Sequence, residues 1–318
     1  MKLQIRVVLE MSALVLVTLV VAIFRPKPES KYNGRPLKDW LIQSFTNYPR
    51  FDREVTLALS AMGENAVRSL VKTAEDEDSP LKRKLIEYSE KLPILSDTFS
   101  SKSWWQFLAI RALGEMGTNA ASAIPSLQRL AAATNDYMLA PAAWAALVLI
   151  RNDSIEALAD QVFDGDRTNS SPAFGVLLAL GSHGKPAIPR VLHELQSSNE
   201  RARSRAAVIL GHIGIESPEC IPAFTNMLAD PNHFMHTIGI NALANCGQMA
   251  TSSAPAVIEL LDDPESNCRH AVLTYLWRVI PAESFEPFHS KVQKAVRDSD
   301  PNVRDSAEQV LRAKRPAR

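Results

Sequence analysis

Apolar and small residues recur at helical spacing along most of this chain, in units that repeat. In the unit from residue 202 to 229, Ala206, Leu210 and Ile213 are separated by 4 and 3 positions, which places them on one helical face. The apolar stretch ends at Gly214, and a second, shorter apolar stretch follows it. This pattern predicts a helix, a short turn and a second helix.

The unit returns with a fixed period. Three glycines are evenly spaced, and a proline follows each of them at the same offset; they are Gly181, Gly214, Gly247, Pro189, Pro222 and Pro255. The leucine position of the first helix also recurs, at Leu59, Leu113, Leu177, Leu210, Leu243, Leu276 and Leu311. We expect each glycine to end a first helix in a left-handed conformation, and each proline to occupy the first turn of a second helix. A period of this length predicts an all-α solenoid of stacked helix pairs, because no pair can bury its apolar face alone.

The linkers between units carry a second signature, Asp-Pro, at residues 230, 263 and 300, where we expect Asp to cap the next helix. The strings DPNVR at Asp300 and RSRAAVILGHIG at Arg203 resemble the HEAT-repeat family, in particular its short bacterial form. The resemblance extends from about residue 50 to the C-terminus. It implies a right-handed α-solenoid whose second helices line the concave face. It also implies that Arg203, Arg269 and Arg304, which share one position, form an Arg ladder that bonds carboxylates or carbonyls between repeats.

Residues 1–24 contain the most apolar segment. Lys2 and Arg6 precede an apolar run whose uninterrupted part extends only from Met11 to Phe24. This length suits the core of a signal peptide or, with the preceding apolar residues, a short membrane span. No small-residue cleavage motif follows, so we predict an uncleaved anchor helix, with a cleaved signal as the alternative. The short basic start favours export of the repeats, whereas the basic residues after the run favour the cytoplasm. We expect a single-pass bacterial membrane protein with its repeats on the extracytoplasmic side.

Residues 25–49 are predicted to be a Pro-rich tether and an N-terminal capping helix. Asn33-Gly34 marks a turn. Three apolar side chains follow on one helical face, namely Leu37, Trp40 and Leu41. The string resembles a leader that precedes the repeats in membrane-anchored HEAT proteins of several bacterial groups. We expect Trp40 to cover the open end of the solenoid; the alternative is an aromatic docking site.

The solenoid is predicted to span residues 50–318. The first glycine, Gly63, precedes Gly117 by much more than one period, which indicates an insertion near residues 75–103. The third repeat lacks the glycine, and we expect Asn152-Asp153 to make its turn. A last single helix is expected to close the stack.

Composition and motifs exclude several classes of function. The 318 residues include 35 acidic and 35 basic side chains, so no basic face for nucleic acid is expected. Three cysteines are too few, and odd in number, for a disulfide framework, and Cys246 and Cys268 fall at core positions. No nucleophile, phosphate-loop or metal-protease motif is present. His233, His236 and His270 begin adjacent first helices, but no carboxylate or thiol recurs with them. We therefore predict no enzyme, no catalytic residues, no cofactor and no metal.

The sequence thus predicts a membrane-tethered scaffold, expected to be monomeric, that binds a protein partner on the solenoid surface. The exposed second-helix positions assigned to the partner are chemically mixed: Arg129, Arg190, His193, Asn226 and Glu259. Two alternatives stay open. Some short HEAT relatives resemble bilin lyases, which implies an activity on a tetrapyrrole or another small ligand. The other alternative is a purely structural spacer at the envelope.

Overall fold

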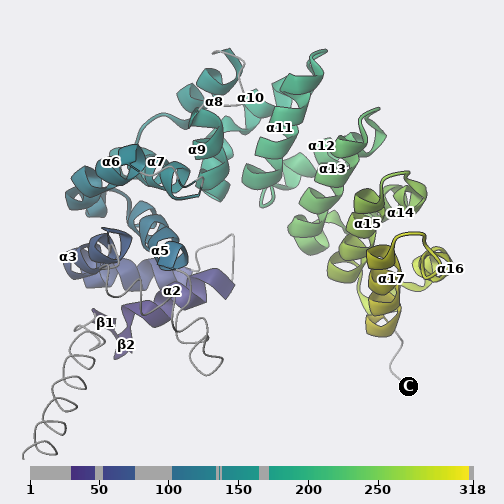
Figure 1. Ribbon diagram of the computed structural model, residues 1–318, viewed down its shortest axis with the longest axis horizontal. Coiled ribbons are helices and arrows are strands. Elements are labelled where there is room, and N and C mark those ends of the chain that lie inside the picture. Colours follow the sequence, from purple (N-terminus) through teal and green to yellow (C-terminus); the bar gives the residue numbers. More distant parts are fainter. Residues whose placement is uncertain are drawn as a thin grey trace, which may run out of the picture.

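The computed structural model shows an all-α solenoid in which helix pairs are stacked along a curved axis (Figure 1). It describes residues 30–46, 53–75, 102–133, 136, 138–164 and 172–314. Most pairs consist of a first helix, a 3-10 segment or tight turn, and a second helix. The first helices are α5 (Lys102–Glu115), α7 (Leu139–Arg151), α9 (Pro172–Leu180), α11 (Glu200–Ile213), α13 (His233–Cys246), α15 (Ser266–Val279) and α17 (Pro301–Ala313). The second helices are α6 (Ile124–Ala133), α8 (Ile155–Asp164), α10 (Ile188–Glu194), α12 (Ile221–Asn226), α14 (Ala254–Glu259) and α16 (Glu286–Ala295).

The N-terminal end is closed by a short hairpin and one helix. Strands β1 (Lys31–Tyr32) and β2 (Arg35–Pro36) pair around Asn33 and Gly34, whose φ angles of 49° and 76° make the predicted turn. Helix α2 (Leu37–Thr46) then packs on α3 (Arg53–Glu75), which holds both helices of the first repeat. Trp40 is 8% exposed and lies in the core that α2 shares with α3, so the capping role predicted for it is confirmed.

The glycines that end the first helices have positive φ, as expected, with one exception. Gly63, Gly117, Gly181 and Gly247 have φ between 52° and 60°, which glycine adopts without steric cost. At Gly63 and Gly247, however, ψ is −136° and −139°, so the backbone there is not in the left-handed helical conformation that was predicted. In the third repeat Asn152 takes the left-handed conformation, with φ 57°, as predicted. Gly214 is the exception, because its φ is −99°. There a Cβ atom would lie 2.9 Å from Cys220 Sγ and from Leu210 O, so this glycine is required by close packing rather than by backbone conformation.

The turns are continued by 3-10 segments before or after the second helices. They are η2 (Gly117–Ala123), η3 (Gly181–Ala187), η4 (Pro218–Cys220), η5 (Met227–Ala229), η6 (Gly247–Ser253), η7 (Leu260–Asp262) and η8 (Ala282–Ser284). The prolines at residues 189, 222 and 255 occupy the first turn of α10, α12 and α14, as predicted.

The curvature corrects one expectation. Figure 1 shows α7, α9, α15 and α17 on the inner side of the arc, and α6, α8, α14 and α16 on its outer side. The first helices, not the second, therefore line the concave face. The order of the two helices within a pair does not determine which of them lines the concave face, because the stack bends toward the layer whose helices pack more closely. Here the inner helices pack directly on one another, as in α5 on α7, α13 on α15 and α15 on α17, and the outer helices contact their neighbours less.

The core lies between the two layers and runs along the stack. One buried cluster extends from Leu37 to Ile150 and the other from Ala145 to Val310, so they meet in α7. Leu210 and the other leucines from Leu59 to Leu276 at the recurring position are fully buried, as predicted, and Leu311 packs on the core at the last turn of the stack.

Several predictions concern residues outside those that the structure describes. The anchor at 1–24, the tether up to residue 29 and most of the insertion near 75–103 belong to this group. Among the described helices, none is both long and apolar enough to cross a membrane.

Candidate functional site

The five residues assigned to a partner from the sequence all lie on second helices, on the outer side of the arc. Three of their side chains are largely exposed: His193 at 78%, Glu259 at 69% and Arg129 at 66%. Asn226 is also exposed, whereas Arg190 is only 26% exposed. We call these five residues the outer ridge. The structure places them in one layer, as the repeat spacing predicted.

The charged members of the outer ridge are paired between repeats. Arg129 Nη2 lies 2.6 Å from Glu75 Oε1, and Glu259 Oε2 accepts a hydrogen bond from Lys291 Nζ. Arg190 bonds to three acidic side chains, and two of them belong to α8 of the preceding repeat; its partners are Asp160, Asp164 and Glu194. These charges neutralise one another, so the outer ridge presents little net electrostatic potential to a partner.

The inner face has the opposite character, because it exposes large apolar side chains. Four such residues lie on the inner helices or on the first half of α3: Leu57 at 56%, Trp144 at 40%, Phe234 at 53% and Trp277 at 55%. Within the described residues, no exposed large apolar side chain lies on helices α6, α8, α10, α12, α14 or α16. An inner helix such as α13 has α11 and α15 at its sides and α12 behind it, so side chains left exposed along it face the inner side.

Two adjoining grooves run between the inner helices, and we call them together the inner groove. The first lies between α11, α13 and α15 and has a volume of about 910 Å³; the second lies between α9, α11 and α13 and has a volume of about 700 Å³. Phe234 and Glu200 line both. The other lining residues include the rings of Phe174 and His270 and uncharged polar side chains such as those of Ser204, Thr237, Asn241 and Asn267. Charged side chains of both signs also line the inner groove, namely Arg201, Arg203, Arg205 and Glu265.

The predicted Arg ladder is present at the N-terminal ends of the inner helices. Each Arg donates from Nη1 to the carbonyl six residues before it: Arg203 to Ser197 at 3.1 Å, Arg269 to Asp263 at 2.9 Å and Arg304 to Asp298 at 2.8 Å. Arg203 also bonds to Asp230 in the next linker, and Arg269 to Asp298. The ladder therefore ties each repeat to the next, as the resemblance implied.

The linker aspartates do less capping than expected. Asp300 does cap α17, since it accepts from the backbone N–H groups of Asn302 and Val303. Asp230 instead bonds the linker N–H of Asn232, and Asn232 itself caps α13. The Asp-Pro signature therefore marks the linkers correctly but mixes two roles, helix capping and ladder bonding.

His236 occupies the ladder position between Arg203 and Arg269, a fact that the sequence could have shown, because it lies one repeat period from each. Its Nε2 lies 2.7 Å from the carbonyl oxygen of Asp230, six residues earlier. Its Nδ1 lies 2.8 Å from Asp263 Oδ2 in the next linker. The histidine thus makes with its two ring nitrogens the same two bonds that the arginines make with their guanidinium groups.

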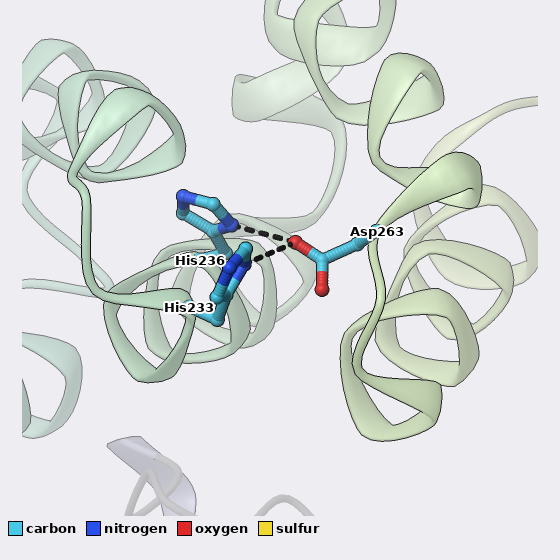
Figure 2. A group of neighbouring side chains, drawn as sticks. All are labelled: His233, His236 and Asp263. Carbon is cyan, nitrogen blue, oxygen red and sulfur yellow. Dashed lines mark hydrogen bonds and ion pairs between the residues drawn. The ribbon is translucent and has the colours of Figure 1, made fainter.

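A second histidine joins this pair. Figure 2 shows His233 and His236 side by side on α13, both directed at Asp263. His233 Nδ1 lies 3.0 Å from the same oxygen, Asp263 Oδ2. Burial favours the neutral form of Asp263, but hydrogen bonds from His236, from the N–H of Glu265 and from His233 hold its pKa below the ordinary value. His270, the third histidine expected nearby, lines the groove beside His233. Sequence reasoning missed Asp263 as the carboxylate that meets the histidines.

The cysteines are core residues, as predicted for Cys246 and Cys268. Both are buried, as is Cys220. Burial raises the pKa of Cys220 to about 11 and that of Cys268 to about 12. These two thiols stay protonated near neutral pH and do not supply a nucleophilic thiolate.

A comparison with protein families agrees with the repeat architecture. Residues 188–277 match the family model described as HEAT repeats. A search of curated proteins gave no match. Similar solved structures include two crystal structures of engineered proteins. The first is 17% identical, with a TM-score of 0.43, and the alignment covers 79% of this chain and 96% of that one. The second is also 17% identical, with a TM-score of 0.38 and coverages of 79% and 99%. A designed armadillo repeat protein is 14% identical, with a TM-score of 0.36 and coverages of 78% and 100%.

Proposed function

Because residues 188–277 carry HEAT repeats, which generally serve as protein-interaction scaffolds, we propose that this chain is a non-enzymatic scaffold whose protein partner binds on the inner face. The observation that carries the proposal is the distribution of exposed apolar side chains. Phe234 and Trp277 are more than half exposed on inner helices, and such aromatic residues are enriched where proteins contact one another.

The chemistry of the inner groove supports a protein partner. Aromatic rings lie there together with uncharged hydrogen-bonding groups such as those of Ser204, Thr237 and Asn241, and the charged side chains that line it are of both signs. A polyanion would instead need an uncompensated basic surface. The groove is built from helices that pack directly on one another, so little conformational entropy is lost when a partner binds.

The outer ridge, which the sequence favoured, is supported less well. Its charged side chains are engaged with neighbouring repeats, so a partner would have to break the bonds of Arg190 to use its charge. Partner binding there stays a prediction, and the inner face and the outer ridge can be compared directly.

Asn241 and Asn226 form a matched pair for this comparison. Both are exposed asparagines, Asn226 on α12 of the outer layer and Asn241 on the adjacent inner helix α13. We would place a photo-crosslinking amino acid at each position in turn and irradiate cells that express the full chain. The proposal predicts one discrete crosslinked partner from position 241 and none from position 226. The reverse result would assign binding to the outer ridge.

A second experiment measures the contribution of the aromatic residues. Phe234→Ser combined with Trp277→Ser should abolish capture of the partner identified by crosslinking, since truncation of a central aromatic residue costs about 2 kcal/mol or more. The matched control is Met249→Ser, because Met249 is also exposed, at 42%, but lies in η6 outside the inner groove. Capture that survives the double substitution would contradict the proposal.

The same experiments separate the alternatives. A spacer predicts no discrete crosslink at either position. A lyase-like protein predicts a small chromophore bound to the purified full-length chain, visible by absorbance. The two parts of the inner groove are open to solvent, and the buried thiols of Cys220 and Cys268 have raised pKa values, so these features do not favour the lyase.

The membrane tether is part of the proposal, and residues 1–24 support it through their apolar sequence alone. We expect the full-length protein to stay in the membrane pellet after a carbonate wash. Fusion of a phosphatase that is active only outside the cytoplasm to the C-terminus should give activity if the repeats are exported. Release by the wash, together with a mature N-terminus after Phe24, would indicate a cleaved signal.

A further inference from the structure

We propose that His233, His236 and Asp263 form a site for a divalent transition-metal ion, with Zn²⁺ as the ion that this donor set suits best. One donor atom from each residue lies within 4.8 Å of the others. Two imidazole nitrogens and one carboxylate oxygen are common zinc donors, and a fourth position would be filled by water from the inner groove.

The hydrogen bonds of His236 orient it for this role. Its Nε2 faces the carbonyl oxygen of Asp230 at 2.7 Å, and a carbonyl can only accept, so Nε2 carries a hydrogen. Its Nδ1 lies 2.8 Å from Asp263 Oδ2 and donates a hydrogen bond there in the absence of an ion. A metal ion that binds Nδ1 and Oδ2 would displace this proton and take over the contact, with a small separation of the two side chains. Histidine ligands of metals are held in the same way by a hydrogen bond from the other ring nitrogen to a carbonyl.

Asp263 is held as firmly as His236. Its Oδ1 accepts the backbone N–H of Glu265 at 2.8 Å, the Cys268 side chain also bonds this carboxylate, and Oδ2 faces both histidines. The Asp263 side chain is only 1% exposed. The nearby charge of Arg269 is compensated by two bonds to Asp298, so it does not occupy the carboxylate of Asp263.

A structural role in the ladder explains two of the three residues. His236 and Asp263 replace an Arg–Asp contact between repeats. His233 is not needed for that contact, because the residues at its position in the neighbouring repeats are Glu200 and Ser266. Yet His233 lies three residues before His236 on the same helical face, and its Nδ1 reaches the same oxygen. His233 therefore brings a second imidazole nitrogen to the place where His236 and Asp263 meet, and three donor atoms close together are what a metal site requires.

An ion can reach the site from solvent. The His233 side chain is 45% exposed and lines the larger part of the inner groove, together with Glu200 and Glu265. Arg203 lines the same part of the groove but is bonded to Asp230, so Glu200 and Glu265 still offer negative charge to a cation at the entrance. Because the ligands come from α13 and from the linker before α15, bound metal would join two repeats.

Zinc binding by the full-length protein tests the proposal. After the purified chain has been stripped with a chelator, calorimetric titration with Zn²⁺ should show one ion per chain and a higher unfolding temperature. Co²⁺ in place of Zn²⁺ should give the visible absorption of a four-coordinate site. His233→Ala should lower the Zn²⁺ affinity at least about 10- to 100-fold, the loss that already follows removal of an outer-shell partner.

Two further variants separate metal binding from structure. His236→Arg restores the residue type found at positions 203 and 269, so it should keep the fold and lose the ion. His270→Asn changes a histidine of the same groove outside the donor set and should bind Zn²⁺ like the wild type. The proposal is overturned if the wild type binds no Zn²⁺, or if His233→Ala and His236→Arg bind it unchanged. Misfolding of one of these two variants leaves the other to decide.

Discussion

The inner and outer layers of this solenoid use their exposed positions differently. Inner helices α11, α13 and α15 have 14 residues each, whereas outer helices α10, α12 and α14 have 7, 6 and 6. The outer layer fills its exposed positions with charges that pair from repeat to repeat. The inner layer leaves Phe234 exposed in the groove and Trp277 exposed on α15.

The inner layer therefore carries both the main contacts between repeats and the free apolar surface, whereas the outer layer adds charge pairs. Repeats in a solenoid contact only their neighbours, so every interface must be stabilised locally. In this chain, burial and the ladder stabilise the interfaces at the inner helices, and solvated ion pairs add to them on the outer side. Free apolar surface then remains on the inner face, where a partner can gain from covering it. The following predictions test the division, starting with the largest effect.

Leu210→Ala should produce the largest loss of stability. Leu210 is fully buried in the inner layer, and an emptied leucine site costs about 2–5 kcal/mol because a cavity remains. Chemical denaturation of the full-length protein should show this loss. Asn226→Ala, at an exposed outer position, should change the free energy of unfolding by no more than about 0.5 kcal/mol. If the two substitutions lowered the free energy of unfolding equally, burial at the inner helices would not be what holds the repeats together.

Asp298→Ala should have the next largest effect, because it breaks a ladder contact. Asp298 accepts two hydrogen bonds from Arg269, at 2.7 and 2.8 Å, and both side chains are 11% exposed. Loss of such a partner leaves a part-buried charge and should cost about 1–3 kcal/mol at neutral pH. Asp305→Ala, at an exposed position of α17, is the matched control.

Low pH should remove the stability that the contact between Arg269 and Asp298 contributes. The hydrogen bond from Arg269 holds the pKa of Asp298 below its ordinary value of 3.8. A lowered folded-state pKa gives stability that is complete above the ordinary value and is lost as the pH falls through the folded-state pKa. The wild type should therefore lose more stability than Asp298→Ala when denaturation is compared at neutral pH and below the ordinary pKa. A parallel loss in both proteins would exclude this contact as the cause.

The sequence predicted the architecture well because its signals are local. Periodic leucines, Gly63 and the prolines at the start of α10, α12 and α14 depend on helix geometry and backbone conformation, which a short stretch specifies. Even the replacement of glycine by Asn152 was visible, since Asn also tolerates the left-handed conformation. The role of Gly214 was not predicted, because glycine is required there by close contact with Cys220 in the next segment.

The candidate sites were harder to predict because they depend on the placement of one repeat against the next. Curvature arises from the relative packing of two layers, so position in the pair did not reveal that Asn226 lies outside and Asn241 inside. The meeting of His236 with Asp263 joins residues 27 apart across a linker, and the ladder position was recognised only from its arginines. The match at residues 188–277 falls where linker signatures are most regular, so it identifies the repeats without identifying a site.

The outer ion pairs should contribute little. Glu259 is 69% exposed and Lys291 34%, and exposed pairs usually contribute about 0.2–1 kcal/mol. A double-mutant cycle with Glu259→Ala and Lys291→Ala should give a coupling energy in this range that falls as salt is added. A coupling energy above about 2 kcal/mol would mean that the outer layer stabilises the stack as strongly as the ladder does.

His183 should show the smallest effect, and only at low pH. It lies in η3 of the fourth repeat, and its Nε2 is 3.0 Å from Oε1 of Glu115 at the end of α5, two repeats earlier. The hydrogen bond to Glu115 raises the pKa of His183 above the ordinary 6.5. A raised folded-state pKa gives stability that is complete below the ordinary value and is lost as the pH rises through the folded-state pKa. His183→Asn should therefore lower the denaturation midpoint at about pH 5.5 and leave it unchanged at about pH 8.5. The change should lie near the lower end of about 0.2–1 kcal/mol, because the side chain is 42% exposed.

Glu115→Gln removes the partner and should reproduce the pH dependence, whereas His193→Asn on the outer ridge should not. If His193→Asn gave the same profile, the effect would come from general histidine charge rather than from this contact between repeats.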